Sequence, residues 1–137
     1  MSKRPKSARE LGIMVGFPPP KDKRITLDNW DRPPFNRWSF QNIRKVLPTA
    51  EVSRGVSAVW DIGRSEHDFD NVDVHHPRDD RWSTVRHVLE QTYTDGFVII
   101  HDNRIVYERY FNDMGDHTQH LSQSVAKSVT ATVCGIL

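Results

Sequence analysis

The stretch SQSVAKSVTATVCGIL, residues 122–137, carries Ser-x-x-Lys at Ser124 and Lys127, at the start of a helical pattern. Side chains three residues apart lie on one face of a helix, so these two come within hydrogen-bonding reach. A serine hydroxyl becomes a strong nucleophile when a base takes its proton, and a lysine kept neutral by its surroundings is such a base. A helix N-terminus also presents N–H donors to a developing oxyanion. The stretch therefore predicts half of an acyl-transfer site.

The sequence upstream decides whether this motif has meaning, because 10 Ser and 6 Lys in 137 residues give about 0.4 chance matches. Residues 96–101 and 104–111 form two strand patterns, joined by Asp102 and Asn103, residue types that tolerate a tight hairpin turn. Before them, Ser83 is the expected N-cap of a helix. That helix carries Val85, Val88, Leu89 and Thr92 on one stripe. The predicted fold class is α+β, in the order helix, antiparallel hairpin, polar connection and nucleophile helix.

Three separated blocks carry a family resemblance. They are TLDNWDRPPFNRWSFQNIRKVLPTAEVSRG, LEQTYTDGFVIIHDNRIVYERYF and HLSQSVAKSVTATVCGIL, in this order. They resemble the N-terminal portion of the 6-aminohexanoate-dimer hydrolases and related carboxylesterases. The resemblance implies the N-terminal part of the β-lactamase and penicillin-binding-protein-like serine hydrolase fold. It also implies Ser124 as acylated nucleophile, Lys127 as general base, a small amide or ester substrate such as linear 6-aminohexanoate oligomers, and no cofactor.

The same resemblance implies two further elements, Tyr-x-Asn or Ser-x-Asn and a Lys-Thr-Gly-like strand, both downstream of the nucleophile. We therefore expect residues 1–137 to be an inactive, truncated piece of a serine hydrolase. The sequence Tyr110-Phe111-Asn112 precedes Ser124, and we interpret it as a packed aromatic followed by a turn Asn. Two alternatives stay open: a non-catalytic fragment that acts as an interaction module, and a relative of the D-alanyl carboxypeptidases or β-lactamases. The lack of an export signal argues against the second.

The chain divides into three sections by composition. Residues 1–26, with Pro18-Pro19-Pro20, are expected to be an extended arm. Residues 27–82 form an N-terminal embellishment and a polar connection, and residues 83–137 form the hydrolase part. In the embellishment, Asn36 is the expected cap of a helix that Pro48 stops. Its apolar residues are Trp38, Phe40, Ile43, Val46 and Leu47. Residues 56–81 hold too few apolar side chains to order themselves.

Composition limits the partners. The chain has 19 Lys+Arg against 18 Asp+Glu, a net charge of +1, which argues against a nucleic-acid-binding protein. No segment is long enough to span a membrane and no signal peptide is visible, so we expect a cytoplasmic protein. Apolar side chains surround the last helix, which indicates a helix enclosed on every side, with Cys134 as a core thiol. If the helix is exposed instead, self-association follows.

Two groups of histidines and acids could in principle gather around a metal ion. They are His75 and His76 with Asp73, Asp79 and Asp80, and His117 and His120 with Asp113 and Asp116. Neither group has a recognised ligand spacing, and both lie in polar stretches. We interpret them as solvated loop residues and expect no metal site.

Overall fold

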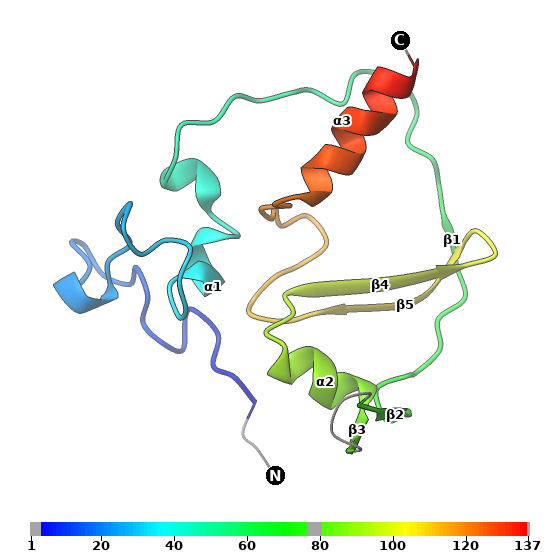
Figure 1. Ribbon diagram of the computed structural model, residues 1–137, viewed down its shortest axis with the longest axis horizontal. Helices are drawn as coiled ribbons and strands as arrows, with labels where there is room; N and C mark the ends of the chain where they lie inside the picture. Colours follow the sequence, from blue (N-terminus) through cyan, green and yellow to red (C-terminus); the bar gives the residue numbers. More distant parts are fainter. Residues whose placement is uncertain (1–3, 77–80, 137) are drawn as a thin grey trace.

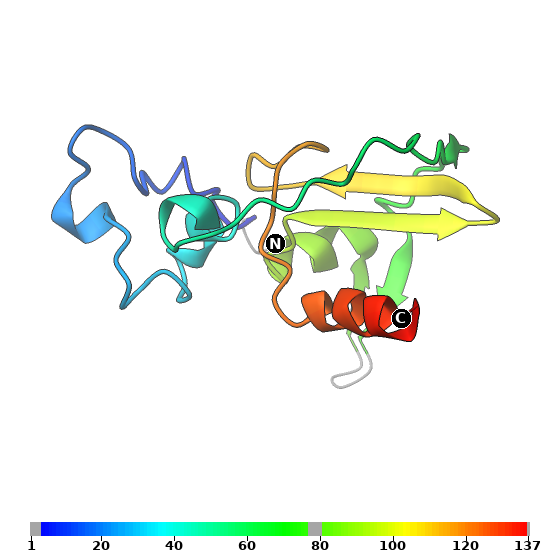
Figure 2. The ribbon, with the colours of Figure 1, turned by 90° about the horizontal axis from the view of Figure 1, so that it is seen from above.

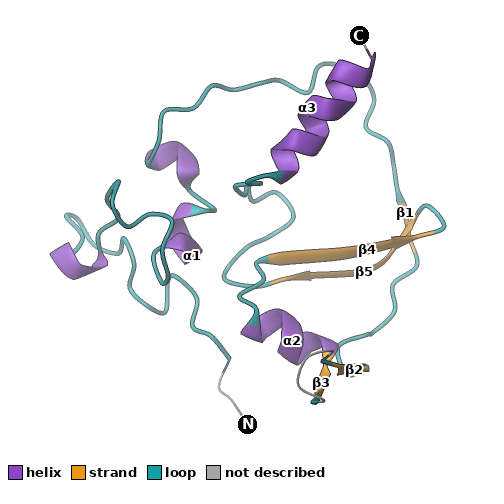
Figure 3. Ribbon diagram, in the orientation of Figure 1, coloured by secondary structure: helices purple, strands orange, loops and turns teal. Residues whose placement is uncertain are grey.

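The computed structural model describes residues 4–76 and 81–136 as a mixed α/β structure with two small sheets (Figures 1 and 3). In chain order the elements are η1 (Lys21–Lys23), α1 (Asn36–Ser39), η2 (Ile43–Lys45), β1 (Gly63–Arg64), β2 (Asp73–His75), β3 (Trp82–Thr84), α2 (Val85–Gln91), β4 (Gly96–His101), β5 (Arg104–Tyr110) and α3 (Val125–Ile136). One sheet has the order β1-β5-β4 and the other pairs β2 with β3. Within the described residues, no helix is long and apolar enough to cross a membrane.

The predicted hairpin is confirmed. β4 and β5 pair antiparallel, with Gly96 opposite Tyr110 and His101 opposite Arg104. Asp102 and Asn103 form the turn between them at φ 49° and 58°, the left-handed conformation that a two-residue hairpin requires. This turn is determined by the residue types at two adjacent positions, which is why the sequence identified it.

The small core is centred on Tyr107 of β5, which is fully buried. The rings of Phe69 and Phe97 pack edge-on against it. Leu89 of α2 is also buried. The cap of α2 is Thr84, whose hydroxyl accepts a hydrogen bond from the N–H of His87, so the prediction of Ser83 was wrong by one residue. Ser83 is instead paired with Val74 between β3 and β2.

The polar connection is more ordered than its composition predicted. In its described part, β1 runs parallel to β5 and β2 pairs with β3. The carboxylate of Asp70 accepts hydrogen bonds from Tyr107 Oη at 2.6 Å, Arg109 Nε at 3.0 Å and Arg86 Nη1 at 3.2 Å. The bond from Tyr107, together with those from the two guanidinium groups, lowers the pKa of Asp70. Charge-assisted hydrogen bonds to the hairpin therefore replace the apolar burial that this segment lacks.

The long helix predicted from Asn36 to Pro48 is wrong. α1 has only four residues, and Asn36 is its first residue rather than its cap. The backbone leaves the helical conformation at Asn42, which has φ −133°, and the single turn η2 follows. The side chain of Asn42 explains the break. Its Nδ2 donates to the carbonyl of Trp38 at 2.9 Å, and its backbone N–H turns to the carbonyl of Ser39. The side chain thus takes the acceptor that a continuing helix would use.

The first 26 residues do not form the extended arm that the sequence predicted. Consecutive turns run through residues 8–14, and Ile13 is only 2% exposed. Asn112, at the end of β5, holds this segment. Its Oδ1 accepts from the N–H of Ala8 at 2.8 Å, and its Nδ2 donates to the carbonyl of Arg37 at 2.7 Å. The division of the chain into three sections stays a prediction.

α3 lies apart from the hairpin in both ribbon views (Figures 1 and 2). None of its described residues is buried, and its large apolar side chains are exposed. They are Val125, Val129, Val133 and Ile136. The interpretation of Cys134 as a core thiol is wrong for this structure, because the thiol is exposed. The sequence shows that the helix is apolar all round, but no described element packs against it.

Candidate active site

Ser124 and Lys127 meet as the spacing predicted. Lys127 Nζ donates a hydrogen bond to Ser124 Oγ at 2.9 Å, across the first turn of α3. Both residues are exposed. The contact brings an amine and a hydroxyl within proton-transfer distance. The catalytic roles of the two side chains stay predictions.

The backbone in front of α3 is held in a tight turn. Gln123 has φ 49°, an uncommon conformation for a residue with a side chain, directly before Ser124. The N–H groups of Val125, Ala126 and Lys127 donate to the carbonyls of the residues three positions before them. In the described part of the chain the N–H of Ser124 has no such acceptor. The N–H of a serine nucleophile is a typical oxyanion donor, which makes the N–H of Ser124, unpaired within the described residues, consistent with the predicted role of this residue.

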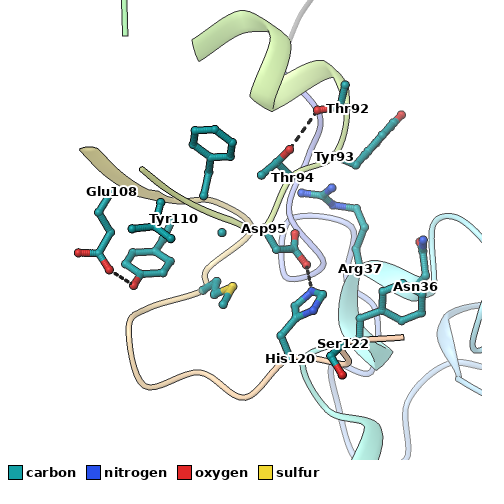
Figure 4. Close-up of a pocket in the computed structure, with 15 residues that line it drawn as sticks. Asn36, Arg37, Thr92, Tyr93, Thr94, Asp95, Glu108, Tyr110, His120 and Ser122 are labelled. Carbon is teal, nitrogen blue, oxygen red and sulfur yellow. Dashed lines mark hydrogen bonds and ion pairs between the residues drawn. The ribbon is translucent and has the colours of Figure 1, made fainter. Parts of the chain in front are cut away.

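A cavity of about 710 Å³ is lined on one side by residues of α1 and on the other by residues of the β4–β5 hairpin (Figure 4). Its polar lining includes Arg37, Asp95, Tyr110, His120 and Ser122. Neither Ser124 nor Lys127 lines it, although Ser122 is only two residues away in the sequence. The predicted nucleophile therefore lies at the solvent-exposed start of α3, outside this cavity.

The segment that leads to Ser124 is fixed by His120. Its Nε2 lies 3.0 Å from Asp95 Oδ2, the dashed contact in Figure 4, and its Nδ1 lies 3.0 Å from the carbonyl oxygen of Leu121. The His120 ring also meets Phe40 edge-on at 6.0 Å between centroids, and the N–H of Leu121 donates to the Phe40 carbonyl at 2.8 Å. The prediction that His120 is a solvated loop residue is wrong, and no local spacing links it to Asp95. In the structure, His120 instead anchors the segment that leads to Ser124.

Two polar residues of the cavity wall keep unfilled hydrogen-bonding groups. Arg37 is 7% exposed, and its guanidinium stacks 5.2 Å from the centre of the Tyr93 ring. Among the described residues, Arg37 Nε, Arg37 Nη1 and Asp95 Oδ1 have no hydrogen-bond partner. A buried polar atom without a hydrogen bond costs free energy, so we expect these three atoms to hydrogen-bond to groups other than the described side chains.

Tyr110 and Asn112 both make contacts within the fold. The Tyr110 hydroxyl donates to the Glu108 carboxylate, and this hydrogen bond raises the pKa of Tyr110 to about 12. Glu108 also pairs with Arg64 of β1. Asn112 lies at φ 55°, and its side-chain oxygen and nitrogen each make one hydrogen bond, to Ala8 and to Arg37. The interpretation of a packed aromatic followed by a turn Asn is confirmed.

The histidines do not form a metal centre in the described part of the chain. No group of three or more His, Cys, Asp or Glu side chains there could hold a metal ion. Asp79 and Asp80, which belong to one of the two candidate groups, lie outside the described residues. His117 lies 3.8 Å from Asp116 at the surface, an exposed pair.

No family model matches the chain, but comparison with known proteins finds similar proteins. The 6-aminohexanoate-dimer hydrolase of Paenarthrobacter ureafaciens is 33% identical over 130 residues, covering 95% of this chain and 29% of that protein. A solved structure from Bacillus anthracis, named as a proposed 6-aminohexanoate-dimer hydrolase, matches with a TM-score of 0.75 at 26% identity, over 84% of this chain and 29% of its own. The resemblance predicted from the sequence is thus confirmed: the chain is related to the 6-aminohexanoate-dimer hydrolases, over a region that makes up 29% of the length of each relative.

Proposed function

We propose that this chain carries the nucleophile and general base of a serine hydrolase that cleaves amide or ester bonds. The observation that carries the proposal is the 2.9 Å contact between Lys127 Nζ and Ser124 Oγ at the start of α3. The names of the relatives specify the 6-aminohexanoate dimer. A small linear amide of that kind, or a short carboxylester, is the proposed substrate.

The proposed reaction proceeds through an acyl-enzyme. Lys127 in its neutral form takes the proton of Ser124 Oγ while the oxygen attacks the substrate carbonyl carbon. The N–H of Ser124 stabilises the resulting oxyanion. The carbonyl re-forms as the bond to the amine or alcohol breaks, and the leaving group takes up the proton that Lys127 removed from Ser124, which returns Lys127 to its neutral form. Water then attacks the acyl group on Ser124 by the same steps, which releases the acid and frees the serine.

We further propose that the 137 residues alone do not turn over substrate. A lysine acts as a base when burial or a nearby cation favours its neutral form, and Lys127 is exposed. Tyr110, the tyrosine of the sequence Tyr110-Phe111-Asn112, already donates its hydroxyl hydrogen bond to Glu108. The chain spans 29% of its relatives, so a general acid supplied by the unmatched part fits these observations. The order α2, hairpin and α3 supports the β-lactamase-like form of the fold.

The cellular context stays a proposal as well. We propose a cytoplasmic location, no nucleic-acid or membrane partner, and self-association through α3. Of these, self-association has the most direct physical basis, because the apolar residues of α3 are exposed.

The test is to co-express the chain with the unmatched part of the Paenarthrobacter ureafaciens relative and react it with a fluorophosphonate or an activated ester. Mass spectrometry should place one label on Ser124. Lys127→Ala and Lys127→Arg should slow labelling by about 10²- to 10⁴-fold, because an arginine stays protonated and cannot act as a base.

Matched controls remove serines and a lysine that the proposal does not use. Ser122→Ala, Ser128→Ala and Lys45→Ala should label at the unaltered rate. A label on Ser122 or Ser128, or full labelling of the Lys127→Ala protein, would show that this Ser-x-x-Lys is a chance match.

A further inference from the structure

His120 connects the segment before α3 to the start of the hairpin (Figure 4). Its contact with Asp95 Oδ2 joins residues 25 positions apart in the sequence. Asp95 directly precedes β4, and its side chain is only 9% exposed. Its backbone is held as well, because its carbonyl accepts from the N–H of Phe111 at 2.8 Å. His120 is therefore bound to a point that the hairpin itself fixes.

Phe40 and Leu121 complete this attachment. The Phe40 ring meets the His120 ring at 87°, and the Phe40 carbonyl accepts from the N–H of Leu121. On the other side of the ring, Nδ1 faces the Leu121 carbonyl at 3.0 Å. A carbonyl and a carboxylate only accept, so both ring contacts form together in the imidazolium, and the neutral tautomer with hydrogen on Nε2 keeps the bond to Asp95. The long-range bond is thus compatible with either charge state of the ring.

This attachment is the last one before the nucleophile. Ser124 follows His120 by four positions. Among the described residues, no hydrogen bond or ion pair joins residues 122–136 to an earlier part of the chain. The intervening backbone is a tight turn, in which the N–H of Val125 donates to the Ser122 carbonyl at 3.1 Å. A displacement at His120 is therefore passed on to Ser124.

We propose that His120, held by Asp95, is a positioning residue for Ser124. It acts through residues 121–123 and fixes where the serine oxygen stands relative to the hairpin. The inference rests on the proposed function, in which Ser124 attacks a carbonyl carbon. Such a reaction needs the two atoms about 3–3.5 Å apart, and a misplacement of about 1 Å costs on the order of 100-fold in rate. Loss of the bond between His120 and Asp95 should therefore slow acylation.

The test is the rate of fluorophosphonate labelling of Ser124, in the chain co-expressed with the unmatched part of the Paenarthrobacter ureafaciens relative. Measurement over a range of reagent concentrations separates the limiting rate from the half-saturating concentration. His120→Leu should lower the limiting rate by about 10- to 100-fold and leave the half-saturating concentration unchanged. His120→Gln keeps an N–H donor for Asp95, so it should recover most of the lost rate. His117→Leu is the matched control, because the His117 side chain is 99% exposed, and it should label at the unaltered rate.

A second variant separates positioning from stability. His120→Leu leaves the Asp95 carboxylate with Gln41 Nε2 at 3.4 Å, and a buried charge that loses its partner destabilises a fold. Asp95→Ala removes the same bond together with the buried charge, so it should fold and slow labelling to the same extent. The final labelled fraction measures how much protein is folded, whereas the limiting rate measures the position of the nucleophile.

Three results would overturn the proposal. They are an unaltered limiting rate in His120→Leu and Asp95→Ala, a smaller labelled fraction at an unaltered rate, and a His120→Gln protein as slow as His120→Leu. The second of these would reduce His120 to a purely structural role. An unaltered chain that takes no label on Ser124 would instead refute the proposed function, and this inference with it.

Discussion

Replacing Asn112 by alanine should release the N-terminal segment from the hairpin. Asn112 is 8% exposed, and its side chain joins Ala8, from the first turns of the chain, to Arg37 of α1. The alanine variant leaves the N–H of Ala8 and the carbonyl of Arg37 without these partners. Both residues are buried, so water does not readily replace the lost bonds.

The cost follows from these contacts. Each buried backbone group left without a partner costs about 1–3 kcal/mol. Alanine at φ 55° adds about 1 kcal/mol, because its Cβ crowds the backbone in the left-handed conformation. We therefore expect a loss of about 3–7 kcal/mol, which is roughly 10²- to 10⁵-fold in the folded-to-unfolded ratio.

Urea unfolding followed by fluorescence, with hydrogen exchange at the Ala8 amide, measures this loss. Asn103→Ala is the matched control, since Asn103 has φ 58° at the exposed hairpin tip and lacks the two buried bonds. It should cost only about 1 kcal/mol. Asn112→Gly removes the bonds without the backbone penalty and should fall between the two. If Asn112→Ala costs no more than Asn103→Ala, the argument from buried hydrogen bonds is refuted.

Three further predictions concern other parts of the chain. Thr84→Ala should destabilise α2 by about 1 kcal/mol in thermal unfolding, whereas Ser83→Ala should cost less than about half of that; the reverse order would restore Ser83 as the cap. Because the pKa of Asp70 is lowered from 3.8 in the folded state, its ionised form stabilises the fold at neutral pH and this contribution is lost as the pH falls below about 4. Asp70→Asn should therefore flatten stability against pH in the acid range, and an unchanged slope would count against the network. With α3 uncovered, the isolated chain should bind a hydrophobic dye, self-associate in sedimentation and react at Cys134 with a thiol reagent; a dye-silent monomer with a protected thiol would contradict the exposed helix.

The sequence by itself determined the features that depend on neighbouring residues. Asp102 and Asn103 identified the hairpin turn because only a few residue types tolerate its left-handed backbone. The Ser124 and Lys127 contact followed from helical spacing alone. The cap of α2 was located to within one residue, since Ser83 and Thr84 are both able to cap. Both pair with β2, and the hydroxyl of Thr84, the last residue of β3, is the one that accepts from the N–H of His87.

Tertiary structure decided what depends on partners distant in the sequence. Asp70 orders the polar connection through Tyr107, Asn112 holds Ala8, and Asp95 meets His120, and in each pair the residues lie at least 25 positions apart. Composition showed that the connection lacks apolar residues, but hydrogen bonds to charged groups of the hairpin supplied its order instead. The apolar character of α3 was readable from the sequence, whereas its exposure was not. Burial is a property of what packs against a helix, and no local pattern contains that information.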